Sequence, residues 1–437
     1  MLFETDRKFQ LEHPKAFFCE KLLTMFGVLG YSGFILFLVM PNAGLTDEFS
    51  VLAKASWYLV YLVTLLLVCF RWRTLLLKLP KIIPLIVMLA LIIASISWSI
   101  MPEVSIKATI SLIFTLFFGL YLATRGPLLS TLRIFGGAWL IMTFLALALI
   151  FAVPSFGVDQ DIHIGAWKGW MLTKNHFGGN MARANLLFFC LLFLDQRNRK
   201  LWMLGLAITM ICVIGSTSKT ALLSALMPYG LWIVYAISKR SILYAIAMVW
   251  AFISIVTLTT YMITNHPEQF VSLIGRDLTF TGRTGIWEQS LHWIQLNKWI
   301  GYGYSAFWEA PNGPADHIRY ELDFEVAHAH NSWLDIALDT GLIGAAIFAS
   351  ITLWCLLKSA WLATGQHGPI LIIMMVQILA VTFSESVLLG YNSYVNVFYY
   401  FLISYILIGY KIPYPNINQP LSAPDWAFST KPANYHA

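Results

Sequence analysis

Residues 134–153, IFGGAWLIMTFLALALIFAV, form a run of twenty residues without one charged side chain. At the rise of an α-helix, such a run is long enough to cross the roughly 30 Å hydrocarbon layer of a bilayer. Similar runs recur on both sides of it, and charged residues make up only 11% of the 437-residue chain, against about 25% in soluble proteins. The sequence therefore predicts an all-α, polytopic membrane protein and not a β-barrel, whose strands show short alternating segments.

We expect about twelve transmembrane helices, which follow the apolar runs of the sequence. Their approximate positions are residues 22–40, 55–70, 82–100, 106–123, 134–153, 179–195, 201–216, 220–238, 242–263, 333–356, 369–386 and 391–410. The chain then divides into nine helices over 1–263, a large helical loop over 264–332, three helices over 333–410 and a proline-containing tail over 411–437. The first 20 residues are polar and lack the pattern of a cleavable signal peptide, so the first helix should remain in the mature protein.

Most basic residues sort by loop, as the positive-inside rule requires. With the N-terminus placed in the cytoplasm, eighteen of the 28 Lys and Arg residues are cytoplasmic, both termini are cytoplasmic, and the large loop is periplasmic. The net charge of +6 then reflects membrane topology and not nucleic-acid binding, and the five cysteines form no C-x-x-C pair. The ten basic residues on the outer side are Lys54, Lys107, Lys168, Lys174, Arg183, Lys219, Arg276, Arg283, Lys298 and Arg319.

Four of these outer cations lie beside apolar runs. Lys168 and Lys174 belong to the segment AWKGWMLTKNHFG, and Arg183 follows in the next predicted helix. Lys219 interrupts an apolar hairpin in the segment STSKT. A cation at membrane depth costs about 2.5–3.5 kcal/mol, so it usually has a partner or a task. For the segment AWKGWMLTKNHFG, with its two lysines, its His and its two Trp rings, one interpretation is a site for phosphate and sugar, and the other is an aromatic belt with snorkelling lysines.

The most polar part of the chain lies between the ninth and tenth predicted helices. It contains TGRTGIW at 281–287, GYG at 301–303 and HAHNSWL at 328–334. A membrane protein needs no such segment to stay in the bilayer. We interpret this stretch as the active-site loop of an enzyme that acts at the outer membrane surface.

A short helix is expected at the start of this polar stretch. Thr281 or Thr284 can cap it, because a hydroxyl oxygen accepts from the free N–H groups of a first turn. Trp287, Leu291 and Ile294 would then line one face at helical spacing.

Arg283 lies in the glycine-containing turn that leads into this helix. Backbone N–H groups at a helix N-terminus favour anions, and the guanidinium fork can bind two phosphate oxygens. The competing interpretation is a surface Arg paired with Glu288 or another acid of the loop. Glu385, between two serines near an outer helix end, has a similar ambiguity, since it can pair with a cation or simply be solvated.

His328 and His330 point the same way if their segment is extended. The segment SWLD that follows resembles a capping box, which places His330 and Asn331 just before a helix N-terminus. One imidazole can serve as a general base on a sugar hydroxyl, because its pKa lies near working pH. The alternatives are a metal site with Asp323 or Glu325 as further ligands, and a histidine pair without a task.

Taken together, these segments resemble the O-antigen ligase and polymerase superfamily, and most closely its exopolysaccharide-polymerase branch. The resemblance covers roughly residues 95–345, and each motif is short, whereas their order and spacing are fairly specific. The segments that carry it are WSIMPEVS at 98–105, WKG at 167–169, KNHFG at 174–178, STSKT at 216–220, TGRTGIW at 281–287, GYG at 301–303, HAHNSWL at 328–334 and GLIG at 341–344.

The resemblance implies a fold related to the membrane-embedded C-type glycosyltransferases. It also implies a donor glycan on undecaprenyl diphosphate, an acceptor glycan, a site on the periplasmic side of the bacterial inner membrane, and neither metal nor cofactor. The family's diphosphate-binding arginine corresponds to Arg283, and its presumed base corresponds to His330. Lys168 and Lys219 stand where the family more often has Arg, and a Lys loses the bidentate fork. The residues that we expect to contact substrate are Lys168, Lys174, Lys219, His328, Asn331, Arg183 and Trp287.

Three functions remain open on the sequence. A polymerase joins lipid-linked repeats, with a polysaccharide co-polymerase as a possible partner, and the patterns around Trp98 and Trp167 favour it. A ligase passes the same donor to lipid A core or to a protein side chain. A flippase for the lipid-linked glycan predicts charges along a mid-membrane path and two related halves, whereas here the cations gather at one end and no repeat is found.

Overall fold

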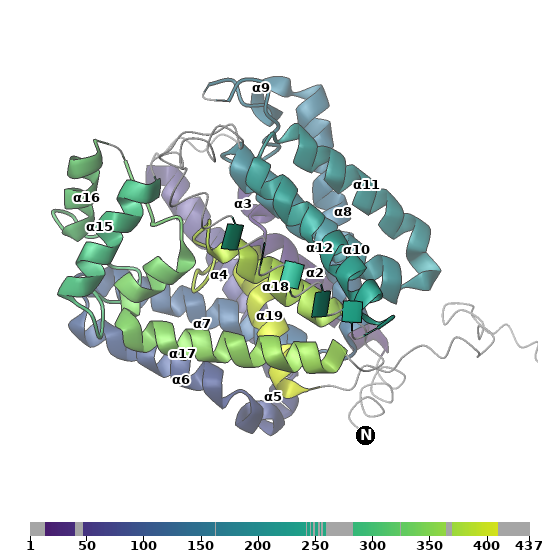
Figure 1. Ribbon diagram of the computed structural model, residues 1–437, viewed down its shortest axis with the longest axis horizontal. Coiled ribbons are helices and arrows are strands. Elements are labelled where there is room, and N and C mark those ends of the chain that lie inside the picture. Colours follow the sequence, from purple (N-terminus) through teal and green to yellow (C-terminus); the bar gives the residue numbers. More distant parts are fainter. Residues whose placement is uncertain are drawn as a thin grey trace, which may run out of the picture.

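A computed structural model of the chain describes residues 14–39, 47–241, 283–363 and 369–409, apart from Ile162 and Phe324, together with isolated positions between 243 and 258. Every regular element in these ranges is a helix (Figure 1). The longer ones are α2 (Pro14–Tyr31), α4 (Asp47–Phe70), α6 (Ile83–Ser95), α7 (Pro102–Thr124), α8 (Leu128–Ala152), α10 (Lys174–Leu194), α11 (Arg199–Gly215), α12 (Lys219–Ser238), α15 (Arg283–Leu296), α17 (Ser332–Ala363), α18 (Ile370–Thr382) and α19 (Tyr394–Ile408). The shorter ones are α3 (Phe34–Val39), α5 (Trp72–Lys78), α9 (Pro154–Gly157) and α16 (Pro314–Leu322).

Seven helices of the described ranges are long and apolar enough to cross a membrane, and an eighth is counted if the pair bent by 91° between α5 and α6 forms one span. Helices α18 and α19 are shorter apolar helices. The predicted class, an all-α polytopic membrane protein, is confirmed, but the count of twelve spans is not. The first predicted span is divided between α2 and α3 at Gly33, and the ninth, at 242–263, lies outside the described residues except for isolated positions.

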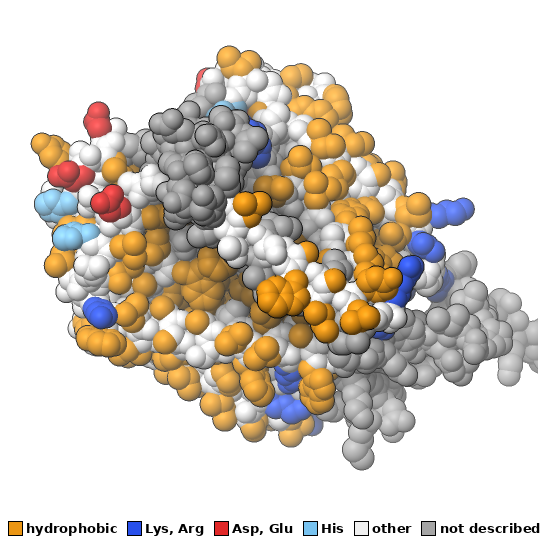
Figure 2. Space-filling view, viewed as in Figure 1, with side chains coloured by type: hydrophobic (Ala, Val, Ile, Leu, Met, Phe, Trp, Pro, Cys, Tyr) orange, Lys and Arg blue, Asp and Glu red, His pale blue; other side chains and the backbone are white. Residues whose placement is uncertain are grey.

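The surface has two distinct ends. Figure 2 shows hydrophobic side chains over most of the visible face, with His, Asp and Glu at the edge occupied by α15 and α16 and several Lys and Arg near the opposite edge. Exposed apolar residues such as Leu223 on α12 and Trp354 on α17 suit contact with lipid. Between α4 and α5, Arg71 donates two hydrogen bonds of 3.0 Å to the buried carboxylate of Glu20.

Helix α19 forms the centre of the bundle, and each of its fifteen residues is buried. It packs against α7 at Gly119, where an added Cβ would lie 2.7 Å from Cβ of Tyr400, so only glycine allows this approach. Trp139 of α8 packs edge-on against Tyr394 at the start of α19. The helices around α19 are therefore closely packed.

Helix α17 is broken at Gly341, whose φ of 67° and ψ of −173° are not helical. The segment 298–304 fills the break. The N–H groups of Tyr302 and Gly303 donate to the carbonyls of Leu338 and Asp339, and the N–H of Leu342 donates to the carbonyl of Lys298. We call this pairing of segment 298–304 with the α17 break the clasp.

Residues of three sequence motifs form or support the clasp. A Cβ on Gly341 would lie 2.1 Å from the carbonyl oxygen of Trp299. The segment 98–105 supports the clasp from the other side, because the indole of Trp98 donates to the carbonyl of Ile300 and Ser105 Oγ donates to that of Tyr304. The motifs at 98–105, 301–303 and 341–344 thus have a structural role.

Helix α15 departs from prediction in which face it buries. Its buried residues are Ile286, Ser290 and Ile294, whereas Leu291 is 51% exposed, so the predicted face was wrong at that position. Thr284 lies inside the helix, and Thr281 lies outside the described residues.

Candidate active site

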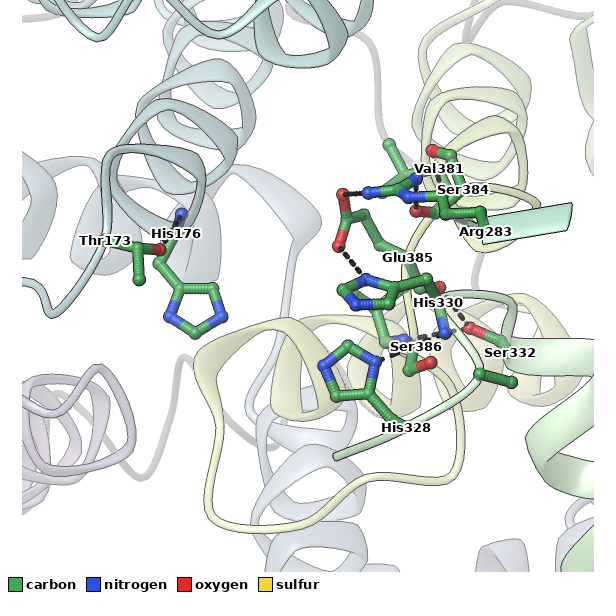
Figure 3. A network of polar contacts seen from close by, with 12 residues as sticks. Thr173, His176, Arg283, His328, His330, Ser332, Val381, Ser384, Glu385 and Ser386 are labelled. Atoms are coloured by element: carbon green, nitrogen blue, oxygen red, sulfur yellow. Dashed lines mark hydrogen bonds and ion pairs between the residues drawn. The ribbon is translucent and has the colours of Figure 1, made fainter. Parts of the chain in front are cut away.

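Arg283 is the first residue of α15, and its guanidinium reaches the loop between α18 and α19 (Figure 3). One terminal nitrogen donates to the carbonyl of Ser384, and the other donates to Oε1 of Glu385 at 3.2 Å. The side chains of Arg283 and Glu385 are 18% and 27% exposed, so the pair is partly shielded from water. Arg283 is therefore paired with Glu385 and not with Glu288, and this contact decides between the two interpretations of Glu385.

His330 lies on the other side of the same carboxylate. Its Nδ1 is 3.9 Å from Oε2 of Glu385, an ion-pair distance that is too long for a hydrogen bond. Burial raises the pKa of Glu385, but its contacts with His330 and Arg283 outweigh burial and hold that pKa below its ordinary value. Glu385 is thus ionised at neutral pH and faces a cation on one side and an imidazole on the other.

The backbone of His330 has a φ of 51°, in the left-handed region that non-glycine residues seldom adopt. In this conformation its N–H donates to Nδ1 of His328 at 3.3 Å, and the two rings lie 4.1 Å apart. Burial and the neighbouring His330 lower the pKa of His328 to about 4. His328 is therefore neutral, accepts at Nδ1, and carries its proton on Nε2.

The peptide of Ala329, between the two histidines, is held from both sides. The indole N–H of Trp287 donates to its carbonyl at 2.9 Å, and its own N–H donates to Oδ1 of Asp335 at 3.0 Å. Trp308 donates to the same oxygen of Asp335 at 2.9 Å. Trp287, which we expected to contact substrate, is thus placed to fix the histidine loop.

Asn331, also expected to contact substrate, acts as the N-cap of α17. Its Oδ1 accepts from the N–H groups of Trp333 at 3.0 Å and Leu334 at 3.4 Å. The predicted capping box was therefore wrong in its details. Ser332 instead donates to the carbonyl of Glu385 at 2.7 Å and accepts from the N–H of Val387 at 2.9 Å.

A cavity opens beside Glu385, between α10, the start of α12 and the loop after α18. Glu385 and His328 line one side of it, and Arg183 and His176 of α10 line the other. Arg183 donates to Oδ1 of Asn180 at 3.0 Å, and its buried Nε has no hydrogen-bond partner among the described residues. The remaining residues that line the cavity are Asn175, Gly179, Ser218, Thr220, Ala221, Ser224, Val381, Ser386 and Val387.

The three predicted lysines lie outside this lining. Lys174 is half-buried at the start of α10, and its Nζ is 3.3 Å from Oγ1 of Thr217. Lys219 is exposed at the start of α12, directly between two lining residues, so both lysines lie at the rim. Lys168 is half-buried in the loop before α10, where its charge acts on Asp159.

His176 lines the cavity as well, although it was not among the residues that we expected to contact substrate. It lies in the segment 166–178, for which phosphate and sugar binding was one of the two interpretations. Its backbone N–H donates to Oγ1 of Thr173, the N-cap of α10, and Figure 3 shows its ring across from His328 and His330. Its position seven residues, or about two turns, before Arg183 on the same helix was the available signal.

Glu325 is one of the two acids that we considered as further ligands for a metal on the histidine pair. Its side chain is 94% exposed, and its carboxylate lies 3.7 Å from Nε of Arg319. Within the described part of the chain, no group of three or more His, Cys, Asp or Glu side chains is arranged to hold a metal ion.

Parts of this chain match known proteins. Residues 202–349 match the family described as O-antigen ligase, a region that contains Lys219, Arg283 and His330. A second match is the exopolysaccharide production protein ExoQ of Rhizobium meliloti (strain 1021), which is 24% identical over 200 residues. Both matches support the O-antigen ligase and polymerase superfamily, near ExoQ, as the group of proteins that this chain resembles. The match covers 43% of this chain and 45% of ExoQ, so it spans less than half of either protein.

These matches agree with the resemblance drawn from the sequence motifs, including the position near ExoQ. The activity, substrates, mechanism and orientation of this chain are matters for proposal.

Proposed function

We propose that this chain transfers a glycan from undecaprenyl diphosphate to a hydroxyl of an acceptor sugar, at the periplasmic face of the bacterial inner membrane. The observation that carries the proposal is that Arg283 and His330 flank one carboxylate, Glu385, which lines a cavity. Glycosyl transfer from a diphosphate needs a cation for the leaving group and a base for the incoming hydroxyl. Arg283 and His330 can supply these two groups, and both lie against the same carboxylate.

Cations on three elements surround the place where the diphosphate would bind. Arg283 approaches from α15 and Arg183 from α10, and Lys174 and Lys219 stand at the rim. Such charges stabilise the negative charge that grows on the leaving diphosphate, and more strongly in a site that excludes water. The neutral His328 can donate its Nε2 proton to a substrate oxygen. The polyprenyl chain would lie between the lipid-facing helices.

The reaction is balanced within these groups. His330 accepts the proton of the acceptor hydroxyl, and the acceptor oxygen forms a bond to the anomeric carbon. The bond from that carbon to the diphosphate oxygen breaks, and undecaprenyl diphosphate leaves with the electron pair. Attack opposite the leaving group inverts the anomeric carbon.

The test uses the purified protein in liposomes with a synthetic undecaprenyl-diphosphate-linked repeat unit. Release of undecaprenyl diphosphate and the length of the glycan product are measured together. Arg283→Ala and His330→Ala should each lower turnover by about 100-fold or more, while the exposed Lys298→Ala serves as the control. Normal turnover in both site variants would refute the proposal.

We favour a polymerase, whose acceptor is a second lipid-linked repeat, because the relative ExoQ is named for exopolysaccharide production. The ligase alternative rests on the description of the matching family. The same assay separates them: a polymerase elongates the lipid-linked repeat without any other acceptor, whereas a ligase turns over only when lipid A core or another acceptor is added. A flippase would release no undecaprenyl diphosphate under either condition.

A further inference from the structure

Glu385 contacts both groups on which the proposed reaction depends. Its Oε1 accepts from Arg283 at 3.2 Å, and its Oε2 lies 3.9 Å from Nδ1 of His330. The backbone around it is fixed, because Ser332 Oγ donates to the Glu385 carbonyl and accepts from the N–H groups of Val387 and Leu388. The carboxylate is thus held in one place between a cation and an imidazole.

Nδ1 of His330 is buried and has no hydrogen-bond partner among the described residues. A movement of about 1 Å brings it into hydrogen-bond range of Glu385. A carboxylate at Nδ1 fixes the ring with its proton on that nitrogen, so that the other nitrogen, Nε2, is free to accept a proton. It also stabilises the imidazolium that forms when the acceptor hydroxyl is deprotonated.

Arg283, in contrast, is already engaged by the loop. Its two terminal nitrogens donate to the carbonyl of Ser384 and to Glu385. A diphosphate that binds both terminal nitrogens of Arg283 therefore competes with the carboxylate for them. Glu385 also repels the diphosphate, because both are negatively charged.

We infer that Glu385 is a positioning residue of the transfer reaction, which orients His330 as the base and keeps Arg283 in place until the diphosphate displaces the carboxylate. The inference rests on the proposed function. It predicts that removal of the carboxylate lowers kcat without raising the donor KM, because the carboxylate assists the chemical step and competes with donor binding. A carboxylate with a structural role alone has no reason to separate them.

The experiment compares Glu385→Gln and Glu385→Asp in the liposome assay, with Glu288→Gln on the exposed face of α15 as the matched control. In Glu385→Gln, kcat should fall about 10-fold to 100-fold, while KM for the lipid-linked donor stays equal or falls. Glu385→Asp should restore most of kcat. Binding of undecaprenyl diphosphate alone, measured by quenching of intrinsic fluorescence, should be as tight or tighter in Glu385→Gln.

Three results would overturn the inference: an unchanged kcat in Glu385→Gln, a raised donor KM together with weaker undecaprenyl diphosphate binding, or no recovery in Glu385→Asp. Failure of the proposed function itself has a different pattern, in which Arg283→Ala and His330→Ala also keep their turnover. If Glu385→Gln lowers the melting temperature, both kcat and the melting temperature of Glu385→Asp are measured. A Glu385→Asp protein that regains the melting temperature but not kcat would count against the inference.

Discussion

The indole N–H of Trp287 donates to the carbonyl of Ala329 across 2.9 Å. This single bond ties α15, which begins with Arg283, to the loop that carries His328 and His330. Residues more than forty positions apart in the chain are thereby held in register, and the distance from the guanidinium to the imidazole depends on it.

Trp287→Phe keeps the ring but removes this hydrogen bond. We expect kcat to fall about 10-fold, because a small misplacement of the base relative to the diphosphate site slows transfer. Stability should fall by only about 1 kcal/mol, the usual contribution of one hydrogen bond. The measurement is kcat with the lipid-linked repeat, beside a thermal melt.

The control for that variant is Trp354→Phe, since Trp354 is 59% exposed on α17, far along the helix from the histidine loop. A kcat for Trp287→Phe equal to that of the control would show that the loop keeps its position without the bond.

Arg183 and Lys168 should differ in their effect on donor binding. Arg183 lines it, whereas Lys168 lies in the preceding loop beside Asp159. We expect Arg183→Gln to raise the donor KM about 10-fold or more, and Lys168→Gln to raise it by less than about 3-fold, because a charge acts strongly only where the diphosphate binds. Donor KM is measured for both variants at one ionic strength.

Melting temperatures accompany these values, because Arg183 is largely enclosed by α10 and its neighbours. If Lys168→Gln raised the donor KM more than Arg183→Gln, with both proteins folded, the diphosphate would bind near the loop at 158–173 and not in the cavity.

The pKa of His328, lowered to about 4 by burial and by His330, makes stability depend on pH. Between about 4 and the ordinary histidine pKa of about 6.5, the unfolded chain binds a proton that the folded chain does not bind. Stability therefore decreases as pH falls through that window. In His328→Gln this contribution is absent, so its melting temperature should fall less between pH 6.5 and 4.5 than that of the unmodified protein.

The slope of melting temperature against pH is the quantity to compare, with His292→Gln, at an exposed position of α15, as the matched substitution. Parallel slopes for His328→Gln and the unmodified protein would contradict the lowered pKa of His328.

Gly341→Ala should disrupt the clasp. Its Cβ would lie 2.1 Å from the Trp299 carbonyl, and the φ of 67° with ψ of −173° suits glycine alone. We expect a loss of about 3 kcal/mol or more, seen as a melting temperature lower by several degrees or as poor yield.

Gly230→Ala is the paired control, because Gly230 lies inside α12 with nothing within 4 Å of an added Cβ. Alanine favours a helix over glycine by about 1 kcal/mol, so this variant should melt at the same temperature or higher. Equal losses in both variants would show that the break at Gly341 tolerates a side chain.

Some of the site could be predicted from the sequence because the bilayer simplifies the problem. Polar residues in an apolar chain need a reason, and this argument singled out Arg283 and His330. The structure brings both against Glu385. Their roles in catalysis stay predictions, as does the orientation of the protein in the membrane.

The sequence could not show which distant residues come together. Glu385 and His176 line one cavity but lie more than 200 positions apart, and no local sequence pattern links them. The cap of α17 was assigned to Ser332 because its spacing fits a capping box, but the loop after α18 competes for that hydroxyl and leaves Asn331 to cap. The buried face of α15 was missed at Leu291 for a related reason, since the packing partner of a helix decides its inward face.

The clasp also has a mechanical consequence. The outer turns of α17, residues 332–340, are fastened to segment 298–304, and the lipid-facing turns begin beyond the break. Hydrophobic mismatch tilts or stretches a helix that is continuous across the bilayer. We expect such tilting to be taken up at Gly341, so membranes of different thickness should leave the spacing between His330 and Glu385 unaltered.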